Sequence, residues 1–364
     1  MSPSEKYQKL CEMGEKVALL GTVSSLLDWD LETYLPKDSL PLRSKQVELM
    51  AEIKHKEATS PTFGKLLFEL IDKKSGKVLE DSFDDIQKAA LREWRNDYLQ
   101  AVKLPDAFVA SFAKATSQAS RAWDEAKQND TFATFAPHLK TIVDLCRKRA
   151  ELLGYEGHPY NALVNEYEPK MRVEFLDELF GKLKPILTEK VKKSSDLSAD
   201  PQFLHGEFDG EKVLELSKFL LETQCLDMNS ARIDVSAHPF CSGAHPKNIR
   251  LTSHRETSHV MGNISAVMHE GGHALYEQGI EEKYFGTPIG ESVSLGIHES
   301  QSRFWECFIG QSRPFCTFLL PHLQKFFPEK FKTVTADELY AAINKIRPSF
   351  IRIHADEVTY ILHV

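Results

Sequence analysis

The chain has 364 residues, of which 42% are hydrophobic, and it carries a formal net charge of -8. This length and composition predict a globular protein with a substantial core, arranged as one large helical unit or as two or three domains. The negative charge excludes a general electrostatic attraction to nucleic acid or to an anionic membrane surface.

Targeting signals and membrane spans are not evident. The N-terminal apolar run from Val17 to Leu27 stops at Asp28 without a small-residue cleavage pattern. No run reaches the roughly 20 apolar residues that a bilayer span requires. The six cysteines are scattered without a CxxC pair, which fits a reducing compartment better than a disulfide framework. We therefore expect a cytoplasmic protein with no nucleic-acid partner and no membrane partner.

Helical periodicity runs through most of the chain and predicts a mainly α fold. Apolar residues recur three and four positions apart, as from Phe175 to Leu187, with charged residues between them. The exception lies between Ala231 and Ser253, where two short stretches alternate apolar and polar residues. This pattern predicts two short strands joined by a loop, and a strand edge of this kind can hold an extended peptide. Breakers divide the rest into helices at 36–41, 75–76, 104–105, 154–159, 200–201 and 286–290.

The segment His269-Glu270-Gly271-Gly272-His273 carries the strongest chemical signal. Residues four apart on a helix point the same way, so His269 and His273 can bind one zinc ion while Glu270 acts as the base. This HExxH spacing favours a metallohydrolase. The two glycines each cost about 1 kcal/mol in a helix interior, and the room they leave predicts a close neighbour, such as another helix.

A third protein ligand is expected on the next predicted helix, Ser294 to Trp305. His298 and Glu299 are both candidates, and we favour Glu299 because a His₂Glu site leaves one position for water. His298 or a nearby carboxylate would then orient a ligand histidine through its other nitrogen. On the same helix, the spacing of Phe304, Trp305 and Phe308 is typical of core positions.

Together these segments resemble the M32 metallocarboxypeptidases, the family of Taq-type thermostable carboxypeptidases. The likeness runs from about Leu26 to the last residue, beginning with the segment from Leu26 to Tyr34. Five short motifs stand in the family's order: His238-Pro239-Phe240, Asn248-Ile249-Arg250-Leu251-Thr252, His269-Glu270-Gly271-Gly272-His273, His298-Glu299-Ser300-Gln301 and Ile351-Arg352-Ile353-His354-Ala355-Asp356.

The resemblance implies a large helical, two-lobed fold with a deep groove and a small β-ribbon beside the HExxH helix. It implies a homodimer that removes C-terminal residues from peptides. Zn²⁺, or alternatively Co²⁺, would be bound by His269, His273 and Glu299, with Glu270 as the base. We expect a single catalytic domain over residues 1–364, with a mostly helical lobe over 1–225 and the active-site motifs over 226–364.

Two departures from the family pattern affect this expectation. The family's DxRxT motif begins here with Asn248, so a charged support for Arg250 is lost while a hydrogen bond can remain. Relatives also continue with further helices beyond the motif at Ile351, whereas this sequence stops in an apolar run at Val364. We therefore expect a domain that is C-terminally incomplete relative to the family.

Recognition of a peptide's free C-terminus calls for an arginine, whose planar fork can donate two parallel hydrogen bonds to a carboxylate. Arg352 and Arg250 are the candidates, and an ordinary structural arginine is the competing interpretation for each. His238 is expected to contact substrate or the developing oxyanion. The alternatives are a metal-binding but catalytically silent peptide-binding scaffold and an endopeptidase with the same HExxH chemistry.

Overall fold

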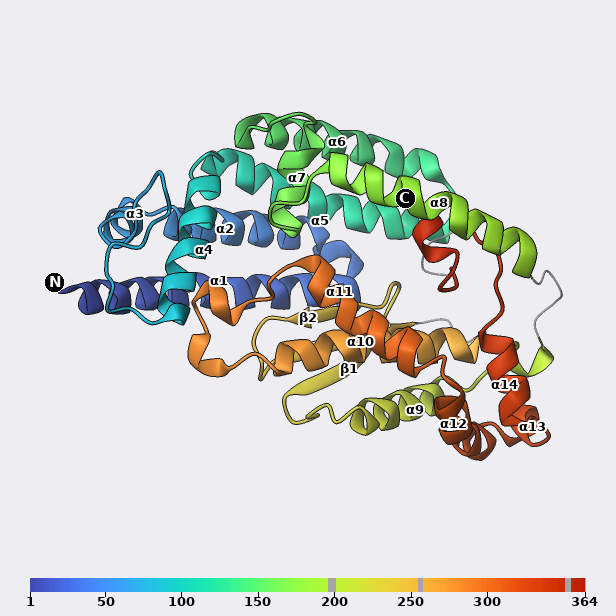
Figure 1. The fold of residues 1–364 in the computed structure, drawn as a ribbon. Coiled ribbons are helices and arrows are strands. Elements are labelled where there is room, and N and C mark those ends of the chain that lie inside the picture. Colours follow the sequence, from blue (N-terminus) through green and yellow to red (C-terminus); the bar gives the residue numbers. More distant parts are fainter. Residues whose placement is uncertain (196–200, 255–257, 351–354, 364) are drawn as a thin grey trace. The chain divides into compact units, whose positions relative to one another are not determined.

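The computed structural model describes residues 1–195, 201–254, 258–350 and 355–363. It is mainly helical with one small sheet, which confirms the fold class expected from the helical periodicity (Figure 1). Clustering of contacts divides the chain into two compact units. The first comprises Met1–Glu166, Ser242–Ile249 and Glu277–Val293, and the second comprises Tyr167–Cys241, Arg250–Tyr276 and Ser294–Val364.

The first unit is built on long helices that pack side by side. In sequence order α1 packs on α2, α2 on α5, and α5 on α6 (Figure 1). Breaks expected near Pro36 and Ser75 fall between helices in the structure, as predicted. The helices are α1 Pro3–Thr33, α2 Leu40–Ala58, α3 Pro61–Phe68, α4 Asp85–Ala101, α5 Asp106–Gln128 and α6 Phe132–Leu153, and α7 Tyr160–Tyr167 follows at the boundary.

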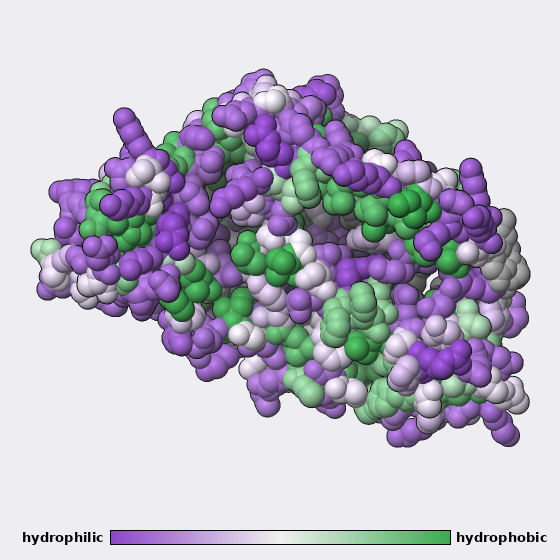
Figure 2. Space-filling view, viewed as in Figure 1, coloured by the Kyte–Doolittle hydropathy of each residue, from purple (hydrophilic) through white to green (hydrophobic). Residues whose placement is uncertain are grey.

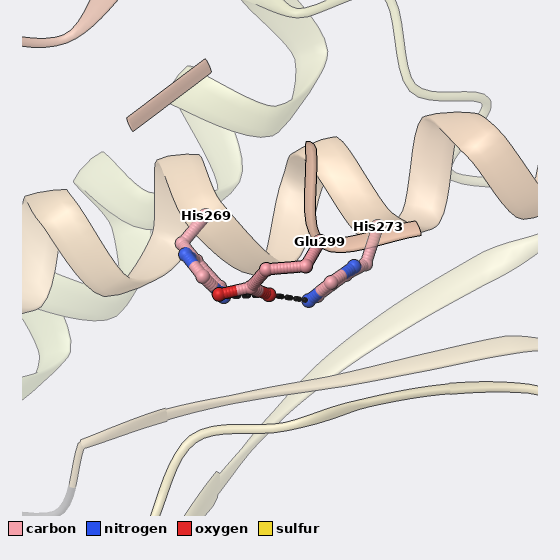
Figure 3. Close-up of side chains that lie close together, drawn as sticks. All are labelled: His269, His273 and Glu299. Atoms are coloured by element: carbon pink, nitrogen blue, oxygen red, sulfur yellow. Dashed lines mark ion pairs between the residues drawn. The ribbon is translucent and has the colours of Figure 1, made fainter. Parts of the chain in front are cut away.

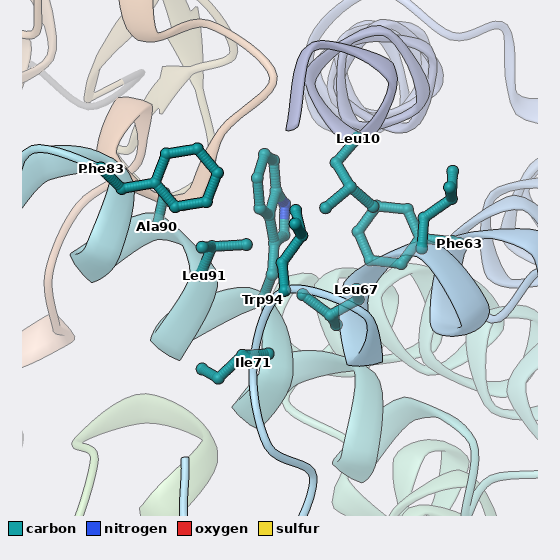
Figure 4. Packing of buried hydrophobic residues seen from close by; sticks show 10 residues of the cluster. Leu10, Phe63, Leu67, Ile71, Phe83, Ala90, Leu91 and Trp94 are labelled. Carbon is teal, nitrogen blue, oxygen red and sulfur yellow. The ribbon is translucent and has the colours of Figure 1, made fainter. Parts of the chain in front are cut away.

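The core of this unit gathers where α3 and α4 meet α1 (Figure 4). Leu10 of α1, Leu67 of α3 and Leu91 of α4 are fully buried, and Trp94 meets Phe63 edge to face with the ring centroids 5.9 Å apart. Capping boxes at Ser2 and Asp84 satisfy the first amide groups of α1 and α4. A second cluster, between α5 and α6, consists of Leu104, Phe108, Ala150, Leu153 and Ala162.

The second unit contains the HExxH helix and a separate aromatic core. Phe208 meets Phe327 edge to face at a centroid distance of 5.1 Å, and Phe331 is fully buried. The helices are α8 Val173–Ser194, α9 Gly210–Thr223, α10 Val260–Gln278, α11 Leu295–Arg303, α12 Arg313–Phe326, α13 Pro328–Phe331 and α14 Ala336–Ile343. The shorter turns of this unit are η2 Gln202–Leu204, the π-helical η5 Phe304–Ile309 and η7 Tyr360–His363, and those of the first unit are η1 Lys37–Ser39, η3 Glu282–Tyr284 and η4 Pro288–Gly290.

The sheet has three strands where the alternation of residues predicted two. Strands β1 Ala231–Ser236 and β3 Ile249–His254 are the predicted pair, and β2 Cys241–Gly243 is the additional short strand. The order in the sheet is β1-β3-β2, so β3 is central. Because β3 has a strand on each side, Leu251, Thr252 and Ser253 are all buried.

The visible surface is largely polar, with separate apolar patches (Figure 2). Among the described residues, no helix combines the length and the apolar character needed to cross a bilayer. All six cysteines are free thiols, and Cys307 and Cys316 are buried.

Candidate metal centre

Helix α10 carries the first two candidate ligands. Its apolar residues recur with helical period, and Val260, Ile264, Val267 and Ala274 are buried along one side. This burial fixes the rotation of the helix about its axis. His269 and His273 lie one turn apart on α10, are partly buried, and therefore point in the same direction.

The glycine pair in α10 has the close neighbours that the sequence predicted. An ideal Cβ on Gly272 would lie 2.6 Å from both the carbonyl oxygen of Gln301 and the Cα of Ser302, which are backbone atoms of α11. A Cβ on Gly271 would meet side-chain atoms of Gln224, next to α9, at 2.2 Å. Glycine at 272 is therefore what lets the backbones of α10 and α11 touch.

Helix α11 brings Glu299 to this contact. Ser294 caps the helix by accepting a hydrogen bond from the amide of Ile297 at 3.2 Å. Glu168 accepts a second one from the amide of Gly296 at 2.8 Å, which places a negative charge at the positive end of the helix dipole. Both contacts fix the start of α11, so Glu299 leaves the helix one turn later.

Three candidate ligands converge in Figure 3, where the carboxylate of Glu299 lies between the two imidazoles. Oε2 of Glu299 is 3.4 Å from Nε2 of His269 and 3.3 Å from Nε2 of His273. Ligand atoms at bonds of about 2.1 Å and tetrahedral angles lie about 3.4 Å apart. Both separations therefore match the edges of a tetrahedral site, and the donor set is the His₂Glu combination of catalytic zinc sites.

The titration behaviour of the three groups shows how strongly they interact. Burial disfavours a charged His269, but hydrogen bonds to Glu299 and Glu306 outweigh it and raise the pKa of His269 to about 10. Burial lowers the pKa of His273. Burial opposes the ionised form of Glu299, yet hydrogen bonds from both histidines hold its pKa well below the ordinary range.

Glu270 is the most buried carboxylate of the cluster, with 7% of its surface exposed. Burial raises its pKa to about 7; the charge of His269 opposes this shift, and Glu299 and Glu306 add to it. A divalent cation nearby would favour the ionised form. Glu270 is thus a carboxylate that can take up and release a proton close to neutral pH.

His298 packs against the ring of a candidate ligand, His273. Its imidazole stacks on that of His273, with centroids 4.3 Å apart and an interplanar angle of 15°. On its other side it meets Tyr276 edge to face at 5.1 Å. Of the two ligands that the sequence left open, Glu299 is the one whose carboxylate joins the histidine pair.

Of the three residues expected to contact substrate, the structure describes His238 and Arg250. His238 lies in the segment after β1, where its carbonyl accepts a 2.6 Å hydrogen bond from Ser236. Arg250 lies in β3; burial, followed by the charge of Arg232, lowers its pKa, and Asp234 opposes the shift. Arg352 lies outside the described residues.

Asn248 precedes β3 and donates its backbone amide to the carbonyl of His245 at 2.8 Å. It occupies the position where the family pattern has aspartate.

Glu306 and Tyr360 contact the cluster and were not predicted from the sequence. Oε2 of Glu306 lies 2.8 Å from Nδ1 of His269, and the hydroxyl of Tyr360 donates to Oε1 of Glu299 at 3.2 Å. A signal for Glu306 exists in the sequence, since it is an acidic residue two helical turns after Glu299 in an otherwise apolar run. Tyr360 lies in η7, and nothing in its local pattern points to the cluster.

The prediction that Phe304 and Phe308 are core residues was wrong. Phe308 is 73% exposed and Phe304 is 46% exposed. Because Glu306 faces His269, residues two positions before and after it point to the opposite side of the helix.

Two histidines and a glutamate whose ligand atoms lie within 4.8 Å of one another, beside a buried glutamate on the helix of the histidines, are the arrangement of a metallopeptidase of the HExxH class. The chain belongs to the carboxypeptidase Taq (M32) metallopeptidase family, whose sequence model matches residues 9–364. It is thus a member of a family of peptide hydrolases that act with a divalent metal, as the five motifs predicted.

Similar proteins are named as carboxypeptidases. Thermostable carboxypeptidase 1 of Thermus thermophilus is 35% identical over 377 residues, covering 100% of this chain and 72% of that protein. Carboxypeptidase 1 of Bacillus subtilis is 34% identical, covering 98% of this chain and 71% of that protein. The crystal structure of the M32 carboxypeptidase from Deinococcus radiodurans R1 matches with a TM-score of 0.87 and 31% identity, over 99% of this chain and 71% of that one.

Proposed function

We propose that the chain removes C-terminal amino acids from peptides, with Zn²⁺ bound by His269, His273 and Glu299 and with Glu270 as general base. The convergence of Glu299 Oε2 on the Nε2 atoms of both histidines, at 3.4 and 3.3 Å, carries this proposal. Three protein ligands leave a fourth position of a tetrahedral ion open. Co²⁺, which accepts the same nitrogen and oxygen donors, is the alternative metal.

The bound cation would polarise the scissile carbonyl and make water a better nucleophile. The carboxylate of Glu270 accepts the proton that the attacking water releases. It then delivers this proton to the nitrogen of the departing amino acid, so that the amine leaves in a neutral form. The burial of Glu270 supports this role, because burial disfavours its charged form and so makes the carboxylate a better proton acceptor.

Recognition of the substrate's free carboxylate is assigned to Arg352 and Arg250, and contact with the substrate or its developing oxyanion to His238. Each arginine can donate two parallel hydrogen bonds to a carboxylate. The homodimer and the cytoplasmic location also remain predictions from the sequence.

Paired peptides test the proposal. The zinc-loaded protein should release the C-terminal residue from a peptide with a free carboxylate and leave its C-terminally amidated copy intact. Cleavage of the amidated copy would favour an endopeptidase, and no cleavage of either would favour the silent scaffold. Glu270→Gln should keep the metal and lose turnover, because the amide has the same shape and cannot accept the proton; retained turnover would remove Glu270 from its role.

A further inference from the structure

We propose that Glu306 is a positioning residue that orients His269 for metal binding, an inference that rests on the assignment of His269 as a ligand. A carboxylate only accepts hydrogen bonds, so Nδ1 of His269 donates to Oε2 of Glu306 across 2.8 Å. The proton is thereby fixed on Nδ1. Nε2, which faces Glu299, is left with its lone pair available for a cation.

Glu306 is itself held on both oxygens. Oε1 accepts from the hydroxyl of Ser265 at 2.9 Å, and Oε2 accepts from Nη1 of Arg303 at 2.9 Å. The side chains of Glu306 and Arg303 are 17% and 18% exposed, so water competes weakly for these bonds. A carboxylate fixed in this way can impose a direction on the imidazole.

The two helices explain why this contact forms. Ser265 and His269 lie one turn apart on α10, and Glu306 spans that turn with its two oxygens. Glu299 and Glu306 lie seven residues apart along α11 and the π-helical η5, which places them on one side two turns apart. His269 is therefore contacted on Nε2 by Glu299 and on Nδ1 by Glu306.

The second histidine provides a contrast within the same site. Nδ1 of His273 is buried, and among the described residues no hydrogen-bond partner reaches it. Its ring packs against His298 instead. Within the described part of the chain, His269 is thus the histidine of this pair whose Nδ1 meets a carboxylate.

A purely structural role for Glu306, as an ion pair with Arg303, is the competing explanation. Glu357 makes the matched control, because its carboxylate also pairs with Arg303. Glu306→Ala removes the acceptor of His269, whereas Glu357→Ala removes a partner of the same arginine and of Cys307 without touching His269. Zn²⁺ affinity is measured by competition with a chromophoric chelator, and the visible spectrum of the Co²⁺-loaded protein reports on ligand geometry.

We expect Glu306→Ala to bind Zn²⁺ 10- to 100-fold more weakly and to change the Co²⁺ spectrum. Glu306→Gln, which retains an acceptor oxygen, should lose less, and Glu357→Ala should stay within twofold of the parent. Glu306→Gln also serves if the alanine variant does not fold.

Glu306 variants that fold and bind Zn²⁺ like the parent would overturn the positioning role, as would equal losses in Glu306→Ala and Glu357→Ala. Failure of the parent itself to bind Zn²⁺ or Co²⁺ would instead overturn the ligand assignment on which the inference rests.

Discussion

Substitution of Gly272 by alanine should weaken metal binding more than it lowers the stability of the fold. The added Cβ would lie 2.6 Å from backbone atoms of Gln301 and Ser302, whereas ordinary contact begins at 3.4 Å, so α11 must move by about 0.8 Å. Glu299 moves with that helix, and a metal site tolerates ligand displacements of only about 0.2 Å. We expect at least a tenfold loss of Zn²⁺ affinity, equivalent to about 1.4 kcal/mol.

The effect on folding should be smaller. Alanine gains about 1 kcal/mol over glycine in a helix, which offsets part of the roughly 1 to 3 kcal/mol that overpacking costs. Chelator competition gives the affinity, and thermal unfolding of the metal-free protein gives the stability.

Gly271→Ala is the matched control for this prediction. Its Cβ would meet side-chain atoms of Gln224 and Leu221, which can shift without moving α11. Its metal affinity should therefore stay within twofold of the parent, even if its stability falls through loss of the 3.2 Å bond from Gln224 to the carbonyl of Met268. The reasoning is refuted if Gly272→Ala retains parental affinity or if Gly271→Ala loses as much.

Three further predictions concern stability. An ideal Cβ on Gly181 of α8 has no neighbour within 4 Å, so Gly181→Ala should raise the free energy of unfolding by about 1 kcal/mol in chemical denaturation; a decrease would contradict this. Partial desolvation and the carboxylates of Glu291 and Glu93 raise the pKa of Asp97 to about 7, although the residue is exposed, so a modest stability contribution of its protonated form is complete below pH 3.8 and lost as the pH rises through 7. Asp97→Asn should thus raise the melting temperature at pH 8 and not at pH 3.5. The rise should be modest because the residue is exposed to solvent. An equal change at both pH values would show that ionisation of Asp97 is not the cause. Removal of Zn²⁺ by a chelator should lower the melting temperature. If free Zn²⁺ was present at 100 times its dissociation constant beforehand, the loss of stability is about 2.7 kcal/mol, and addition of Zn²⁺ should restore it.

The metal group was predictable because its determinants are local. The spacing of His269 and His273 needs only helical geometry, and the helix predicted after the break at 286–290 carries Glu299. The glycine pair even indicated the close approach of that helix. The roles of Arg250, in β3, and of His238, in the segment after β1, stay predictions, because recognition of a substrate depends on where these side chains would meet it.

The contacts that the sequence did not reveal depend on tertiary packing. Glu306 reaches His269 only because α11 runs on into the π-helical η5 while its start is fixed by Ser294. The same orientation turns Phe304 and Phe308 outward, where apolar character alone had placed them in the core. Tyr360 reaches Glu299 from a segment far along the chain, and residue type gives no indication of such a partner.

The contact between α10 and α11 also determines how much a bound metal ion would stabilise the fold. A cation bound to His273 and Glu299 would close a loop that contains only the segment between them. The entropy of closing a flexible loop grows with the logarithm of its length, and for this segment it amounts to roughly 3 kcal/mol. His273 and Glu299 both lie in the second unit, so loss of the ion should let α11 separate locally from α10.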